Sequence, residues 1–192
     1  MFGQALRFLI DTAFGIVTYA FPLRFMMQWL RAPFRNPIGQ ALTALTDWAV
    51  KPSRRVLPGF RGIDWSTLLL AWLAQLLWLV TVTLLLGHGA GLGGTVIAML
   101  ALVAVVELLR AALWLLIVVV FVQAILSWVA PDGPLAGLFN ALTYRFLAPV
   151  RRVLPPLGGT LDLSPLIVIV LAQLALMLPV QWLESMVLGL VR

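Results

Sequence analysis

Four long apolar stretches alternate with polar segments along the chain of 192 residues. They cover about residues 5–30, 65–86, 95–130 and 164–187. The second stretch, WSTLLLAWLAQLLWLVTVTLLL, carries no charged residue and has the ~20 residues that an α-helix needs to cross a bilayer. The pattern therefore predicts an all-α polytopic membrane protein with four transmembrane helices.

The third stretch is longer than one membrane span requires. A helix through all of it would be about 52 Å long, against ~30 Å of hydrocarbon. Glu107 and Arg110 interrupt the stretch and share one helical face. Residues 110–130 fit one span, with a charged residue at one interface and Trp128 at the other. The sequence leaves three placements open for the apolar segment 95–106: along the interface, as a re-entrant segment, or as part of a long, strongly tilted helix.

Positive charge is concentrated in two of the segments between the spans. Nine of the thirteen Lys and Arg residues lie in segments 31–64 and 131–162, whereas segment 87–94 has no Lys, Arg, Asp or Glu. Four spans place both basic segments on one side of the membrane, which the positive-inside rule identifies as cytoplasmic. A fifth span would separate the two segments. We therefore expect four spans, with both termini outside.

Composition excludes several classes of function. Hydrophobic residues make up 62% of the chain and charged residues 10%, whereas soluble domains have roughly 25% charged residues. The chain has no cysteine, and the single histidine, His88, has no neighbouring metal ligands. There is no phosphate-binding glycine loop with lysine and no nucleophile beside a base. We therefore expect no enzyme activity, cofactor or metal, and we attribute the net charge of +6 to cytoplasmic loops rather than to nucleic-acid binding.

Two segments of the chain repeat the same basic phrase. ALTDWAVKPSRRVLP (44–58) and ALTYRFLAPVRRVLP (141–155) are identical at nine of fifteen positions. Similar offsets pair the tryptophans that close the first span of each half, the Asp-x-Ser motifs and the glutamines of two LAQL motifs. The sequence thus predicts two parallel helix–loop–helix repeats, residues 1–94 and 95–192. The paired positions are Trp29 and Trp128, Asp64 and Asp162, Ser66 and Ser164, and Gln75 and Gln173.

Each basic loop is expected to contain an amphipathic helix that lies in the headgroup plane. Asn36 and Pro37 are suited to begin the first of these helices. Pro134 begins the equivalent stretch, and Pro52 and Pro149 are expected to end the two helices. The predicted apolar faces are Ile38, Leu42, Leu45 and Ala49 in the first helix, and Leu135, Leu138, Leu142 and Phe146 in the second.

The paired arginines are the first candidates for a binding site. The guanidinium group offers a planar donor fork that suits phosphate, so we expect contact with anionic phospholipids or an acidic partner. The alternative is that these residues only set the topology. Asp64 and Asp162, with Ser66 and Ser164, are expected to begin the second helix of each repeat, and the aspartates also suit pairing with the arginines of their own loop. The arginines are Arg54, Arg55, Arg151 and Arg152.

Polar residues within the spans form a second group of candidates. Gln75 and Gln173 are expected near the bilayer midplane and facing inward, as inter-helix hydrogen bonds or, alternatively, as a constriction on a permeation path. Glu107 and Arg110 have the spacing to neutralise each other. Arg24 either snorkels to the cytoplasmic interface or faces the bundle axis.

The combination of motifs resembles the YggT family, called YlmG in plastids and cyanobacteria. The family pattern is Trp at the end of a first span, P-x-R-R-x-x-P, and Asp-x-Ser-Pro opening a second span. One departure is Thr67, which stands where the first copy would have proline. The matching positions are Trp29, Pro52, Arg54, Arg55, Pro58, Asp64 and Ser66, then Trp128, Pro149, Arg151, Arg152, Pro155, Asp162, Ser164 and Pro165.

The resemblance implies a bacterial inner-membrane protein connected with osmotic tolerance, cell division or plastid membrane and nucleoid organisation. It implies no settled molecular activity. We interpret the chain as a membrane scaffold or assembly factor that acts through anionic phospholipids and membrane-protein partners. The alternative is a channel or transporter subunit, which would require a homo-oligomer because four helices leave little room for a pore.

Overall fold

The protein is described here by a computed structural model, in which residues 2–86, 93–154 and 162–189 are described. Its helices are α1 (Phe2–Trp29), α2 (Pro37–Val56), α3 (Trp65–Leu86), α4 (Gly94–Val129), α5 (Ala136–Val153), α6 (Ser164–Ala175), the π-helical turn η1 (Leu176–Val180) and α7 (Gln181–Gly189). Within these ranges, four helical segments are long and apolar enough to cross a membrane: Gly3–Trp29, Trp65–Leu85, Gly94–Val129 and Ser164–Val187. The predicted all-α fold with four candidate spans is confirmed.

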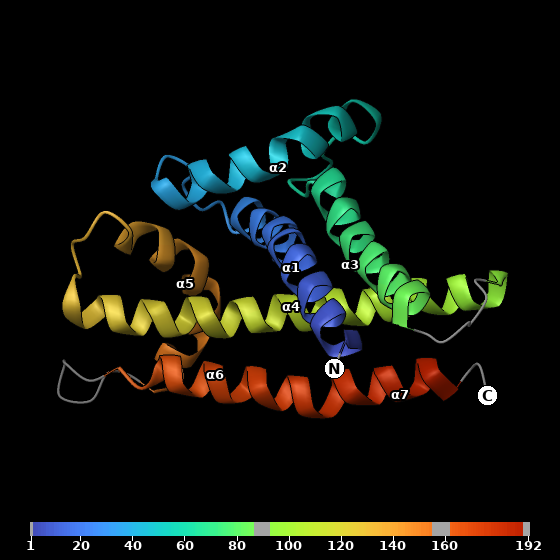
Figure 1. The fold of residues 1–192 in the computed structure, drawn as a ribbon. Coiled ribbons are helices and arrows are strands. Elements are labelled where there is room, and N and C mark those ends of the chain that lie inside the picture. Colours follow the sequence, from blue (N-terminus) through green and yellow to red (C-terminus); the bar gives the residue numbers. More distant parts are fainter. Residues whose placement is uncertain (1, 87–92, 155–161, 190–192) are drawn as a thin grey trace.

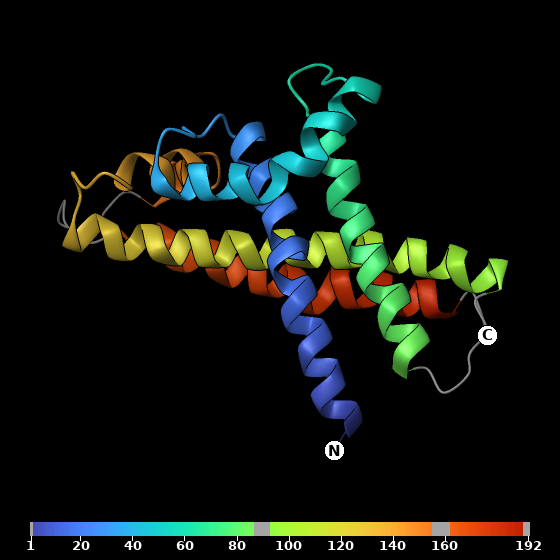
Figure 2. The ribbon, with the colours of Figure 1, turned by 45° about the horizontal axis from the view of Figure 1, so that its top comes forward.

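The spans form two hairpins that cross each other. Helix α1 packs against α3, and α4 packs against α6 and α7. In Figure 1 and Figure 2 the α1–α3 pair runs across the α4–α6–α7 pair. Helix α3 also contacts α4, and α1 contacts α4, so both helices of the first hairpin touch the second through α4. In chain order, α2 connects α1 to α3 and α5 connects α4 to α6. In Figure 1, α2 lies across the ends of α1 and α3.

The segment 95–106, which the sequence left open, belongs to one long helix. Helix α4 runs without interruption over 36 residues, so its length is about 54 Å. Of the three placements, the structure thus selects the extension of a long helix. Glu107 and Arg110 lie near the middle of α4 and do not interrupt it. The helix is much longer than ~30 Å of hydrocarbon.

The fourth span changes its helical type at Pro179. Proline has no N–H to donate, and its ring would clash with the carbonyl four residues earlier, here that of Ala175. The chain accommodates the ring with the π-helical turn Leu176–Val180 and then resumes an α-helix at Gln181. The span therefore continues past the proline instead of ending there.

Helix α2 begins as predicted. The Asn36 side chain accepts a hydrogen bond from the Gly39 N–H at 2.8 Å, and Pro37 occupies the first turn. Position 39 has room for glycine only, because an added Cβ would lie 2.5 Å from the Phe34 carbonyl oxygen. The buried face of α2 consists of Gly39, Leu42, Thr46, Ala49 and Val50.

That face is rotated relative to the predicted one. Leu42 and Ala49 are buried and Ile38 is partly buried, but Leu45 is 52% exposed, so its predicted place on the buried face is wrong. The buried position belongs instead to Thr46, which contacts the α1 residue Arg24. Leu45 and Trp48 form an outward apolar surface. Whether α2 lies in the headgroup plane stays a prediction.

The prediction that proline ends both short helices is wrong. Helix α2 continues through Pro52 to Val56, and α5 continues through Pro149 to Val153. A proline inside a helix removes one backbone hydrogen bond, and the following turn forms nevertheless. The last bonds are Leu57 N–H to Ser53 O at 2.9 Å and Leu154 N–H to Val150 O at 2.8 Å. The arginine pairs consequently lie in the last helical turn, where positive charge is favourable.

The remaining boundaries agree closely with the predicted ones. Helix α1 ends at Trp29, and α4 ends at Val129, one residue after Trp128. Helix α5 begins two residues after Pro134, and buries Leu138 and Leu142 of its predicted face, while Leu135 and Phe146 are partly buried. The larger apolar core joins both halves, and its fully buried members include Met27 of α1, Val120 of α4, and Leu138, Leu142 and Leu147 of α5. Pro155 and His88 lie outside the described residues.

Candidate functional site

An ion pair ties the first arginine segment to the start of α3. Arg54, in the last turn of α2, donates to Oδ2 of Asp64 from Nε at 3.0 Å and from Nη2 at 2.5 Å. The same carboxylate accepts from the Thr67 hydroxyl at 2.8 Å and from the Thr67 N–H at 3.3 Å, so Asp64 caps α3. The Ser66 hydroxyl donates to the Leu57 carbonyl. These contacts fix the connection between α2 and α3, in which Pro58 is exposed.

A second ion pair of the same kind holds the start of α6. Arg151 donates to Oδ2 of Asp162 from Nε at 2.8 Å, and its Nη2 lies 2.7 Å from the same oxygen. Oδ1 of Asp162 accepts from the Ser164 N–H at 2.9 Å, and Pro165 lies in the first turn of α6. Ser164 begins α6, as expected, but its side chain does not cap the helix. Its buried hydroxyl has no hydrogen-bond partner among the described residues.

We call these two ion pairs the arginine–aspartate braces. Burial raises the pKa of Asp64, but hydrogen bonds from Arg54 and Thr67 outweigh it, so the pKa lies below its usual value. Burial also raises the pKa of Asp162, and hydrogen bonds from Ser164 and Arg151 bring it below its usual value. Both carboxylates are therefore ionised at neutral pH, which suits a structural brace and not a proton donor.

The braces divide each arginine pair. Arg54 and Arg151 are bound to aspartate, whereas Arg55 and Arg152 are exposed and have no carboxylate partner in residues 2–86, 93–154 and 162–189. The sequence treated the four arginines as equivalent. Of these four arginines, Arg55 and Arg152 are the two that can bind an outside anion without the loss of an ion pair in the described residues.

A buried ion pair attaches α2 to the first span. Arg24 of α1 is 4% exposed, and its Nη1 donates to Thr46 Oγ1 at 2.5 Å and to Asp47 Oδ1 at 2.7 Å. Lys51 approaches the other oxygen of Asp47 at 2.9 Å. Hydrogen bonds from Lys51 and then from Arg24 lower the pKa of Asp47 below its usual value. Arg24 therefore neither snorkels to water nor faces an open axis, because its charge is compensated by α2.

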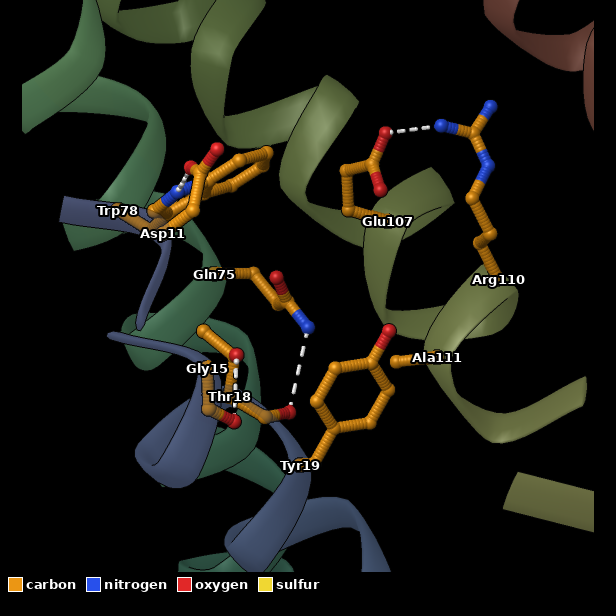
Figure 3. Close-up of a pocket in the computed structure, with 9 residues that line it drawn as sticks. All are labelled: Asp11, Gly15, Thr18, Tyr19, Gln75, Trp78, Glu107, Arg110 and Ala111. Carbon is orange, nitrogen blue, oxygen red and sulfur yellow. Dashed lines mark hydrogen bonds and ion pairs between the residues drawn. The ribbon is translucent and has the colours of Figure 1, made fainter. Parts of the chain in front are cut away.

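Polar side chains of α1, α3 and α4 meet in a cavity of about 200 Å³ within the spans. Figure 3 shows Gln75, Asp11 and Glu107 around a common space. Gln75 is 5% exposed, and its Nε2 donates to the Thr18 carbonyl at 3.3 Å, so its predicted inward orientation is confirmed. Asp11 accepts a hydrogen bond from Trp78 Nε1 at 2.8 Å. Gln75 lies 11 residues beyond Asp64, which corresponds to a depth of about 16 Å.

One arginine of this cavity joins α4 to α7. Arg110 Nη1 lies 2.6 Å from Glu107 Oε1, and Arg110 Nη2 lies 2.5 Å from Glu184 Oε2. The predicted pairing of Glu107 with Arg110 is confirmed. The third partner, Glu184, comes from a helix 74 residues later and could not be paired from local spacing.

Gln173 does not face inward. The LAQL motif places it at the position equivalent to Gln75, but Gln173 is exposed on α6. Its neighbour Ala172 is the buried residue of this turn. The prediction of two inward-facing glutamines is thus wrong for the second half, because α6 packs its Val168–Ala172 face against α4, while α3 packs Ala71 and Gln75 against α1.

Two further long-range contacts were missed from the sequence. One is the Arg24–Asp47 pair, although a buried arginine near a span end signals that a carboxylate is required nearby. The other is Arg145 of α5, whose guanidinium lies 4.6 Å from the centre of the Trp29 ring of α1. Both depend on how helices from different parts of the chain are placed. No group of three or more potential metal ligands occurs in the described parts of the chain.

Four apolar helices, intramembrane ion pairs and a surface rich in unpaired arginine define a multi-pass α-helical membrane protein. The chain belongs to the CCB3/YggT family, whose model matches residues 3–85 and 102–183. It is 36% identical over 188 residues to "Uncharacterized protein PA0392" of Pseudomonas aeruginosa, covering 96% of this chain and 92% of that protein.

Two further relatives have similar coverage. The chain is 35% identical over 173 residues to "Uncharacterized protein in proC 3'region" of Vibrio alginolyticus, covering 90% of this chain and 91% of that protein. It is 30% identical over 169 residues to "Uncharacterized protein YggT" of Escherichia coli K12, covering 88% of this chain and 85% of that protein. No solved structure matches the chain. The family is thereby established, while the prediction of two repeats stays a prediction.

Proposed function

We propose that the chain is a non-enzymatic scaffold or assembly factor of the bacterial inner membrane that binds anionic phospholipid headgroups at its cytoplasmic face. The observation that carries the proposal is the division of the arginine pairs. Arg54 and Arg151 hold the loops in place, and Arg55 and Arg152 are presented from the same helical turns to the surroundings. Envelope maintenance, in osmotic tolerance or cell division, is the setting that the family resemblance favours.

The distribution of charge supports the proposal. All seven Asp and Glu residues lie within the described ranges, and six of them form ion pairs with basic side chains. Six arginines of the two basic loops have no carboxylate partner in those ranges, so these loops carry an excess of positive charge. They are Arg31, Arg35, Arg55, Arg61, Arg145 and Arg152. A basic surface next to a span attracts anionic lipids with roughly 1 kcal/mol per residue.

The test compares lipid selectivity in reconstituted membranes. Spin-labelled phosphatidylglycerol and phosphatidylcholine report, by electron paramagnetic resonance, how strongly each lipid is enriched around the protein. Arg55→Gln/Arg152→Gln is expected to lower the selectivity for the anionic lipid severalfold, and raised salt is expected to weaken it in the unchanged protein. Arg7→Gln, which removes an exposed arginine from the opposite end of α1, is the control. Equal selectivity in all three proteins would refute the proposed headgroup binding.

The proposed orientation has its own test. The chain has no cysteine, so single cysteines can be introduced without a competing thiol. Val56→Cys follows Arg55 at an exposed site, and Thr95→Cys is exposed at the start of α4. In intact spheroplasts an impermeant maleimide is expected to label Thr95→Cys and to leave Val56→Cys unlabelled. The reverse result would place the basic loops outside and contradict the proposal.

One observation favours a second function, a channel or transporter subunit. The cavity around Gln75 lies within the spans, and Asp11, Glu107 and Arg110 line it. Cation flux into proteoliposomes is the direct measurement, with Gln75→Leu as the variant and protein-free vesicles as the reference. Flux that the variant loses would establish a permeation path. Absence of flux, with insertion verified, would leave Gln75 as a hydrogen bond between α1 and α3.

A further inference from the structure

Three arginines from separate parts of the chain line one hollow at the end of α1. Arg31 and Arg61 come from the first half and Arg145 from α5, and the hollow has a volume of about 430 Å³. We propose that this hollow and the apolar groove that adjoins it bind a single anionic phospholipid. The phosphate lies among the three guanidinium groups, and an acyl chain lies in the groove. This inference rests on the proposed lipid binding and deepens it, because it assigns one lipid to Arg31, Arg61 and Arg145, a site separate from Arg55 and Arg152.

The charge in the hollow is uncompensated. All seven acidic residues of the sequence are described, and none forms an ion pair with Arg31, Arg61 or Arg145. Aromatic rings support two of the guanidinium groups, with Arg145 at 4.6 Å from the Trp29 ring centre and Arg61 at 5.3 Å from that of Phe60. Ring support leaves the guanidinium N–H groups free to donate to phosphate oxygens.

Two of these arginines, Arg31 and Arg61, have a positive φ, a backbone conformation that glycine adopts more readily than arginine. Arg31 has φ 55° and follows α1 in a Schellman motif, in which Ala32 N–H donates to Met27 O and Arg31 N–H to Gln28 O. Glycine is the usual residue at that position. Arg61 has φ 54° and forms a two-residue turn with Gly62, a position at which Asn, Asp or Gly is preferred. These two turns fix the backbone of Arg31 and Arg61 at the hollow.

The groove continues the hollow into the spans. It has a volume of about 380 Å³ and is lined by α1, α3, α4 and α5. Trp29 lines both the hollow and the groove, and Phe146 of the groove follows Arg145 of the hollow. Tryptophan at the end of a span marks the level of the headgroups. A phosphate beside Trp29 with a hydrocarbon chain on the membrane side matches this order. The groove is lined mainly by apolar side chains, including Phe25, Leu68, Leu109 and Leu113.

The combination selects a phospholipid over other anions. Free phosphate would use the hollow and leave the groove empty, and an acidic peptide would have no reason to enter an apolar groove within the spans. A zwitterionic headgroup would bring its own cation next to three arginines, which is unfavourable. The structure thus fits one net-negative phospholipid with at least one chain in the groove, held between both halves of the protein.

The test counts bound lipid by native mass spectrometry of the full chain released from detergent. Titration with phosphatidylglycerol is expected to show one tightly bound lipid, and phosphatidylcholine is expected to bind at least about tenfold more weakly. Arg61→Gln removes charge from the hollow, and Ala112→Trp fills the groove without a change of charge. Each is expected to weaken phosphatidylglycerol binding at least about tenfold. The controls are Arg7→Gln and Ala98→Trp, which alter exposed residues outside the hollow and the groove.

Glycerol 3-phosphate, as a competitor, distinguishes a lipid from a phosphate site. Displacement of the lipid only at a large molar excess supports the phospholipid, whereas displacement at equal concentration overturns it in favour of a headgroup-only site. Unchanged phosphatidylglycerol binding in both Arg61→Gln and Ala112→Trp would also overturn the proposal. Equal binding of phosphatidylglycerol and phosphatidylcholine by the variants and the controls would indicate adventitious lipid only and would overturn it as well. Arg55→Gln/Arg152→Gln is expected to retain the bound lipid, so this site and the proposed function fail separately.

Discussion

Asp47→Ala is expected to release α2 from the spans. Arg24 has a side chain that is 5% exposed, and its Nε already lacks a hydrogen-bond partner among the described residues. Removal of the Asp47 carboxylate leaves the guanidinium buried, and Thr46 is then its one remaining hydrogen-bond partner in the described part of the chain. A buried charge that loses its partner destabilises a protein by about 3–5 kcal/mol. The apolar contacts of α2, of which Val50 is the most deeply buried, oppose its release.

The opening of α2 can be measured at a single site. Val50→Cys introduces a thiol at a position with 0% exposure in a chain that has no other cysteine. A maleimide reagent labels this thiol only when α2 moves away from α1 and α3. If opening is in rapid equilibrium, a loss of about 3–5 kcal/mol raises the labelling rate by about 100-fold to 4,000-fold, because 1.4 kcal/mol corresponds to a factor of ten.

Lys51→Gln is the matched control, because it removes the other cation that contacts Asp47. Lys51 is 73% exposed, and an exposed ion pair contributes about 0–1 kcal/mol. In the Lys51→Gln variant the labelling rate of the Val50→Cys thiol is therefore expected to rise at most about fivefold. The double variant Arg24→Met/Asp47→Leu removes both buried charges and is expected to lie close to the unchanged protein. If the Val50→Cys thiol is labelled no faster in Asp47→Ala than in Lys51→Gln, the conclusion that the Arg24–Asp47 ion pair attaches α2 to α1 is refuted.

Three further outcomes follow from other contacts. The pKa values of Asp64 and Asp162 are lowered in the folded protein, so both carboxylates stabilise the fold fully above the unfolded pKa of about 4. This stabilisation is lost as the pH falls through the folded pKa values. In thermal melts recorded over a pH series, Asp64→Asn/Asp162→Asn should therefore reduce the fall of the melting temperature at acid pH. Gly39→Ala should destabilise the fold by about 1–3 kcal/mol, because the added Cβ would clash with the Phe34 carbonyl oxygen; denaturation by sodium dodecyl sulfate measures the change. Gly137→Ala is the control and should have no such effect, because no atom lies within 4 Å of the added Cβ. Arg110→Met leaves two carboxylates facing each other within the spans and should destabilise the fold by about 3 kcal/mol in the same assay; a value below 1 kcal/mol would contradict a structural role for the Arg110 ion pairs.

The sequence predicts the elements of this fold better than it predicts their faces. Span positions follow from hydropathy, and the start of α2 follows from Asn36–Pro37, because both depend on residues close in sequence. The buried face of α2 depends on Arg24, which is distant in sequence and requires a polar partner. Periodicity of apolar residues therefore selected Leu45, whereas the structure buries Thr46. A helix that pairs with a buried charge is one for which apolar periodicity alone is misleading.

The candidate site shows the same dependence on distance. The aspartates and arginines of the braces lie about ten residues apart in one loop, and local reasoning related them correctly. The rule that proline ends a helix failed at Pro52 and Pro149, where α2 and α5 continue. One lost hydrogen bond is outweighed there by the remaining hydrogen bonds of the turn and by its tertiary contacts. The hollow of Arg31, Arg61 and Arg145 was invisible to sequence reasoning, since its three arginines are brought together only by the packing of α5 near the end of α1.

Positions that the sequence pairs between the two halves do not have the same environment. Gln75 is buried against α1, whereas Gln173 is exposed on α6. The Ser66 hydroxyl has a partner in the Leu57 carbonyl, whereas the buried Ser164 hydroxyl has none among the described residues. An exposed amide in the middle of a span is unfavourable in lipid. The exposed Gln173 amide is therefore a position at which a polar partner, such as a side chain of a further helix, would be favourable. The two halves share a motif pattern in sequence, but the packing of α3 against α1 and of α6 against α4 gives the equivalent polar residues different surroundings.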